Sequence, residues 1–140
     1  MSAYPECYVN EIVDTQGKLF EYVADFNHKI DMEDFINNYM QSRTRSFLDH
    51  ADAYLSNLNA SELFRYYCET ENYTLKHGNG MLGFQPNWIG QFYAYYQWLT
   101  GTSSKDTIKK LPLDFVKASY YGLHDLDLDL AVKKVETEKF

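Results

Sequence analysis

The sequence predicts an all-α protein, a compact bundle of about seven to eight helices that forms one domain over residues 1–140. Apolar residues recur at helical spacing along most of the chain, and side chains typical of helix N-caps precede these segments. The few segments that could be strands have no clear partner strand. Hydrophobic residues make up 45% of the chain and aromatic residues 17%, which is enough for a core without a metal or a disulfide.

The first helix is predicted from an apolar stripe with i, i+3, i+4 spacing. The stripe consists of Val9, Ile12, Val13, Gln16, Leu19, Phe20 and Val23. Pro5 suits the first turn, where a backbone N–H is not needed. Gly17 is expected on the polar side, where it weakens the helix by about 1 kcal/mol relative to alanine.

Three further helices are predicted before residue 72. Asp31 is an N-cap for a helix with the stripe Met32, Phe35, Ile36, Tyr39 and Met40. A helix boundary is expected near residues 43–46, because Ser46 and Asp49 fit a capping box. The stripe that follows contains Phe47, Leu48, Ala51, Tyr54, Leu55 and Leu58. Asn59 and Glu62 fit another capping box, which begins the helix with Leu63, Phe64, Tyr66, Tyr67 and Cys68.

Residues 73–84 contain three glycines and an Asn-Gly pair, which leaves a short β-hairpin and an irregular loop as alternatives. Pro86 then begins an aromatic helix that Gly101 ends. Trp88, Phe92, Tyr95, Tyr96 and Leu99 share one side of this helix. Tyr93 and Trp98 lie off that side, so these two residues are predicted to be exposed and to contact a protein partner.

Two more helices are expected after Gly101. The segment SSKD at residues 103–106 fits a capping box for a short helix that ends before Pro112. The segment LPLDFVKASYYG at residues 111–122 predicts another helix, with Gly122 as the residue that ends it.

The stretch HDLDLDLAVKKVE, residues 124–136, fits three structures. Its acids match four positions of a calcium loop (Asp125–Glu136), but Leu130 occupies the position that needs a glycine. A strand would bury every second residue. A helix is favoured: Asp125 caps it, and Leu128, Ala131, Val132 and Val135 form its stripe. Leu126 and Leu130 then add a second apolar side, which indicates heavy burial or a partner.

The net charge and the N-terminal sequence argue against several classes of protein. The net charge is −7; residues 1–70 hold 12 acids and five bases, and residues 71–140 hold eight of each. An acidic chain argues against nucleic acid and anionic membrane as partners. The four lysines at positions 105, 109, 110 and 117 fit a solvated surface. No signal peptide, spanning segment or disulfide framework is expected, so the sequence predicts a cytoplasmic protein.

No catalytic residue, metal site or cofactor is predicted. The four histidines (His28, His50, His77 and His124) are isolated in sequence, and no zinc-ligand spacing appears. Cys68 lies in an aromatic helix, which favours a buried, unreactive thiol. Arg43 and Arg45 either bind a phosphate or carboxylate or pair with the protein's own acids, and internal pairing is favoured.

Three segments resemble an uncharacterised family of short bacterial cytoplasmic proteins. These segments are DMEDFINNYMQSRTR, GFQPNWIGQFYAYYQW and GLHDLDLDLAVKKV. The resemblance covers most of residues 7–135 and implies no established activity and no catalytic residues. Some members lie near toxin-like genes, so the resemblance favours a bacterial protein of a toxin-like or defence locus that works through a partner.

The leading hypothesis is a non-enzymatic protein-protein interaction or accessory protein that binds another protein or forms a homo-oligomer. The first alternative is a protein or enzyme that binds a small ligand or anion in a pocket near Arg43 and Arg45. The second alternative is calcium binding through Asp125–Glu136.

Overall fold

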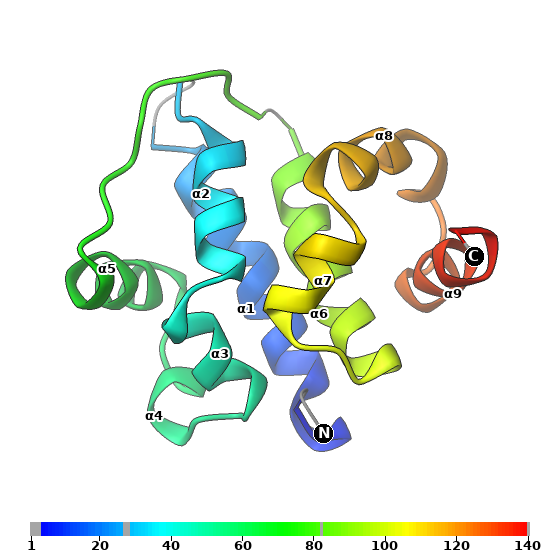
Figure 1. The fold of residues 1–140 in the computed structure, drawn as a ribbon, viewed down its shortest axis with the longest axis horizontal. Coiled ribbons are helices and arrows are strands. Elements are labelled where there is room, and N and C mark those ends of the chain that lie inside the picture. Colours follow the sequence, from blue (N-terminus) through cyan, green and yellow to red (C-terminus); the bar gives the residue numbers. More distant parts are fainter. Residues whose placement is uncertain (1–3, 27–28, 82, 140) are drawn as a thin grey trace.

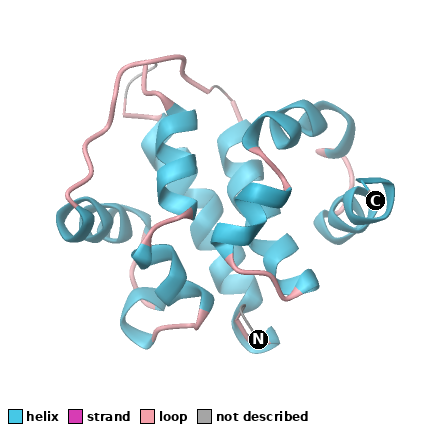
Figure 2. Cartoon of the chain, viewed as in Figure 1, coloured by secondary structure: helices cyan, strands magenta, loops and turns pink. Residues whose placement is uncertain are grey.

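A computed structural model describes residues 4–26, 29–81 and 83–139. The all-α prediction is confirmed: these residues form nine helices, of which eight have seven or more residues (Figures 1 and 2). The helices are α1 Glu6–Ala24, α2 Met32–Met40, α3 Arg43–Asp49, α4 Ala53–Ser56, α5 Ala60–Glu71, α6 Gln85–Thr100, α7 Ser104–Lys110, α8 Leu113–Leu123 and α9 Leu128–Lys139.

Helices α1 and α6 form the centre of the bundle and pack along each other. Helices α2, α5 and α3 lie on one side of this pair, and α7, α8 and α9 lie on the other (Figure 1). The predicted stripe of α1 is confirmed, because all seven of its residues are buried. Helix α6 touches α1, α7, α8 and α9, so it is buried around most of its circumference.

Two glycines allow the close approach of α1 and α6. A Cβ at Gly90 would collide with the backbone carbonyl of Gln16 and lie 2.9 Å from Gly17 Cα. A Cβ at Gly17 would lie 2.8 Å from Gln91 Cγ and 3.0 Å from the Asn87 carbonyl oxygen. Gly17 is buried, so its predicted place on the polar side is wrong: it lies at the contact between the two helices.

A helix begins at Arg43, so the boundary predicted near residues 43–46 is confirmed, but the predicted N-cap residue, Ser46, is wrong. Ser42, not Ser46, accepts the hydrogen bond from the Arg45 N–H, at 3.0 Å. The helix then ends at Asp49, because Ala51 adopts a positive φ of 55°. The stripe expected to be one helix is therefore divided: Phe47 and Leu48 lie in α3, Tyr54 and Leu55 lie in α4, and Ala51 and Leu58 lie outside both helices.

The described residues of 72–84 form an irregular connection rather than a hairpin. Within its described part, one isolated antiparallel bridge joins His77 to Ile30, and no ladder extends it. The segment passes over the ends of α2 and α1 from α5 to α6 (Figure 1). The glycine-rich sequence here supports a crossing loop, which was the alternative prediction.

Two of the helix caps predicted from the sequence are present in the structure, and two others are not. Asn59 and Glu62 form the predicted capping box of α5, and Gly101 ends α6 in the left-handed conformation. Gly122 does not end α8: it lies inside the helix, which continues to Leu123 and is followed by His124. Asp125 likewise does not cap α9, which begins at Leu128 and whose first bond runs from the Ala131 N–H to the Asp127 carbonyl.

Among the helices of the described ranges, none has both the length and the apolarity that a bilayer-spanning helix needs.

Candidate functional site

Arg45, for which internal pairing was favoured over an anion ligand, is the centre of a buried polar network. Arg45 is fully buried and pairs with Asp49, with 3.0 Å between Nη1 and Oδ1. Its Nη2 donates to Gln97 of α6. Asp49 accepts further hydrogen bonds from Gln97 Nε2 at 2.7 Å and from the Ser104 N–H at 2.9 Å. Internal pairing is therefore confirmed for Arg45, whose guanidinium is not accessible to an external ligand.

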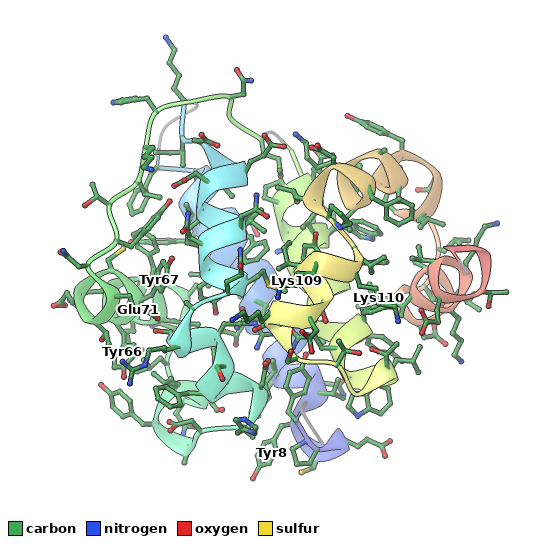
Figure 3. The ribbon with its side chains drawn as sticks, in the orientation of Figure 1. Tyr8, Tyr66, Tyr67, Glu71, Lys109 and Lys110 are labelled. Atoms are coloured by element: carbon green, nitrogen blue, oxygen red, sulfur yellow. The ribbon has the colours of Figure 1, made fainter. Side chains whose placement is uncertain are left out.

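Arg43 lies on the surface, at the first position of α3. Its backbone N–H donates to Glu71 at the end of α5, at 3.2 Å, and the Thr44 N–H donates to the same carboxylate at 2.8 Å. Figure 3 shows Glu71 on α5, on the side that faces α3. Arg43 and Arg45 point to different environments, and so they do not form one anion site.

Glu71→Ala is expected to lower the free energy of unfolding by about 1–2 kcal/mol, because two helix N–H groups lose a charged acceptor at a positive helix end. Urea denaturation followed by circular dichroism measures this loss. Glu69→Ala is the matched control, since Glu69 is exposed on the same helix. Equal losses in the two variants would contradict the role of the Glu71 carboxylate.

The prediction that Tyr93 is exposed is wrong. Tyr93 is 1% exposed, and its hydroxyl donates to the Leu111 carbonyl at 2.8 Å. The stripe argument failed because α7 and α8 cover the side of α6 that the stripe left to solvent. Trp98 is half-buried against Tyr95, with 5.4 Å between ring centroids, so it offers only part of its ring to a partner.

Buried tyrosines limit the pH range over which the fold is stable, on the alkaline side. Burial raises the pKa of Tyr39 and of Tyr93 well above the usual value. In the unfolded chain a tyrosine loses its proton near pH ~10, whereas the folded state still holds it. The stability from these groups is therefore complete below about pH 10 and is lost as the pH rises above it.

Alkaline titration should therefore couple tyrosine ionisation to unfolding. We expect the last tyrosines to ionise, by ultraviolet absorbance, only as the helical circular dichroism signal is lost. Ionisation of every tyrosine with the helical signal unchanged would contradict this coupling.

A surface hollow with a volume of about 550 Å³ lies between α8 and α9. On α8 it is lined by Phe115, Ala118, Ser119 and Gly122, which share one helix face. On α9 it is lined by Lys134 and Val135. A Cβ at Gly122 would meet no atom within 4 Å, so this part of the α8 surface is open. We call this hollow the α8–α9 groove.

Exposed apolar side chains lie on the α8 wall of the groove and on the segments next to it. Phe115 is 37% exposed and Leu130 51% exposed, and Leu130 lies one turn before Lys134 on the same face of α9. Leu126, in the turn between the two helices, is 39% exposed. The helix predicted at residues 124–136 is confirmed from Leu128 onward, and of the predicted second apolar side Leu130 is exposed on α9 while Leu126 lies before the helix. Leu128, Ala131, Val132 and Val135 pack inward as predicted.

A second hollow, of about 530 Å³, lies beside α5. Its walls include Phe26, Ile30, Phe64, Cys68 and Leu75. Burial raises the pKa of the Cys68 thiol to about 11, which supports the prediction of an unreactive cysteine. Lys76 and His77 at its edge are exposed, and Lys76 lies 3.5 Å from Asp34.

The calcium alternative needs a loop where the structure has a helix. Asp129 and Glu136 both lie in α9, and Glu136 accepts a hydrogen bond from Tyr96 at 2.8 Å. Within the described ranges, no three His, Cys, Asp or Glu side chains gather closely enough to hold a metal ion. His124 stacks on Tyr120 and places Nδ1 2.8 Å from the Tyr120 carbonyl, at the end of α8. His28 lies outside the described residues.

The predicted basic group is not a single patch. Lys110 lies 3.7 Å from Glu136 and near the Tyr96 ring, and Lys117 lies 4.0 Å from Glu33. Lys109 and Lys110 are neighbours on α7, as Figure 3 shows. Two of the four lysines therefore face acids of other helices.

The sequence prediction missed Phe115 as a surface residue. The signal was present: Leu113 and Val116 belong to the buried stripe of α8, and Phe115 falls outside that stripe. Phe115, Ser119 and Gly122 follow i, i+4, i+7 spacing and so lie on one face of α8. Ser119 and Gly122 are small, which leaves a groove on that face.

Comparison with known proteins gives no match to a family model, to a curated protein or to a solved structure.

Proposed function

We propose that this chain is a non-enzymatic interaction protein and that the α8–α9 groove binds an amphipathic helix of another protein. The supporting observation is a hollow of about 550 Å³ with exposed Phe115, Leu126 and Leu130 around it. Exposed apolar groups that gather at a groove are typical of a protein-binding surface. Leu126 and Leu130 are also the residues whose apolar excess in the sequence indicates heavy burial or a partner, and both are exposed.

The shape of the groove favours a helix as the occupant. Ala118 and Gly122 are exposed on the α8 wall and have little or no side chain, so a second backbone can come close to α8. Phe115 on the α8 wall, and Leu130 one turn before the groove-lining Lys134 on α9, would pack against apolar side chains spaced at i, i+3 or i+4.

Charge favours a partner other than a second copy. The chain carries a net charge of −7, so two copies repel each other on average. The groove lies in the half of the chain whose acids and bases balance, eight of each. The family resemblance makes the product of a neighbouring, toxin-like gene the first partner to test.

Leu130→Lys tests this function, because a lysine one turn before the groove-lining Lys134 places a charge beside the groove, where the partner helix would pack. We expect at least about tenfold weaker capture of the partner by the variant than by the wild type, in pull-downs at native expression level. Tyr54→Lys is the matched control: Tyr54 is 65% exposed on α4, on the other side of α1 and α6.

Three results would contradict the proposal. They are equal capture by wild type and Leu130→Lys, an equal loss of capture in Tyr54→Lys, and sedimentation as a dimer that Leu130→Lys disrupts. The last result would assign the groove to a second copy of this chain.

A further inference from the structure

Tyr4 precedes the first residue of α1 in the chain, and its side chain is enclosed on all sides as a bound ligand would be. It is fully buried, although the next two residues, Pro5 and Glu6, are exposed. Its hydroxyl donates to the backbone carbonyl of Ala94 in α6. The Arg45 guanidinium carbon lies 5.9 Å from the centre of the Tyr4 ring, within the range of a cation–π contact.

The walls around Tyr4 belong to other elements of the fold. Tyr4 packs in an apolar cluster apart from the main core, formed by Val9, Ile12 and Val13 of α1 and Ala94 of α6. Ala51, Tyr95, Trp98 and Leu128 are partly buried against this cluster. Packing of α1 against α6 holds most of these walls in place, and none of the wall residues is a direct chain neighbour of Tyr4.

The chemistry of these walls selects a phenol. The Ala94 carbonyl accepts a hydrogen bond from a hydroxyl, and apolar side chains surround the ring. Arg45 faces the ring with a cation and keeps a buried Nε for which the described residues provide no hydrogen-bond acceptor. Burial also raises the pKa of the Tyr4 hydroxyl, so the group bound here is the neutral phenol.

We propose that the site around Tyr4 is a phenol-binding site that the chain fills with its own residue 4. In this proposal Tyr4 occupies the site and keeps other phenols out. A free phenol, or a tyrosine side chain of another protein, binds the same wall residues when Tyr4 leaves them. The hydroxyl bond to Ala94 and the guanidinium at the ring distinguish this site from a plain apolar cavity.

The test is thermal unfolding of Tyr4→Ala with phenol as the probe. We expect phenol to raise the melting temperature of the variant in a saturable way, and benzene, which lacks the hydroxyl, to raise it much less. Wild type should not respond to phenol, because Tyr4 occupies the site. Tyr8→Ala is the matched control, since Tyr8 is exposed in the first turn of α1 (Figure 3) and its removal opens no buried site.

N-acetyl-tyrosine amide, tested on the same variant, distinguishes the two sources of the phenol. A rise with phenol alone assigns the site to small phenols, and a rise with both extends it to tyrosine side chains. No rise with phenol, or an equal rise with benzene, would overturn the proposal. If Tyr4→Ala is unfolded, recovery of the helical circular dichroism signal with phenol supports the proposal, and failure to recover overturns it.

Discussion

Asp49→Ala is expected to lower the free energy of unfolding by about 3–5 kcal/mol, the largest loss among the substitutions considered for this fold. Without Asp49, the fully buried guanidinium of Arg45 keeps its charge but loses the acid beside it. Gln97 Nε2 and the Ser104 N–H lose an acceptor in the same step. Removal of one carboxylate therefore weakens the connection of α3 to both α6 and α7.

The chain contains its own control for this prediction. Asp14 and Lys18 form an ion pair at 2.9 Å with the same i, i+4 spacing, but both side chains are about 60% exposed. Asp14→Ala should therefore change stability by no more than about 0.5 kcal/mol. Urea denaturation of both variants measures the difference. A loss of less than about 1 kcal/mol in Asp49→Ala would contradict a buried, charged Arg45.

Gly90→Ala is expected to lower the free energy of unfolding by about 3 kcal/mol, at the upper end of the cost of overpacking. The added methyl group would collide with the backbone of Gln16 in α1, and a backbone cannot move aside as a flexible side chain can. The two central helices would have to separate along their contact. Calorimetric unfolding should show a lower melting temperature.

Gly122→Ala is the matched control in another helix. Gly122 lies inside α8, and a Cβ there would meet no atom within 4 Å. Alanine should therefore stabilise this helix by about 0.5–1 kcal/mol, through its better helix propensity. If Gly90→Ala is as stable as Gly122→Ala, the close approach of α1 and α6 is not a constraint on the fold.

Much of the fold follows from local patterns in the sequence. The stripe of α1 and the caps at Asn59 and Gly101 depend on a few neighbouring residues, so they could be predicted and are confirmed. The break at Ala51 could not be predicted, because its positive φ has no glycine or proline to announce it.

The site depends on contacts between distant segments, and there the sequence was a poorer guide. Arg45 and Gln97 are 52 residues apart, and a pattern within one helix cannot show that they meet. Tyr93 was assigned to the surface because a single stripe describes a helix packed on one side, whereas α6 is surrounded by others. Leu126 and Leu130 can be recognised as an apolar excess because they lie in one short segment of the sequence.

Site-specific photo-crosslinking at Leu130 is the most direct test of a partner bound in the α8–α9 groove. A photoreactive residue replaces Leu130 in one sample and Tyr54 in another, both at native expression level. The groove proposal predicts one adduct with a different protein from position 130 and none from position 54. No adduct at position 130, an adduct with the mass of two copies of this chain, or the same adduct from both positions would contradict it.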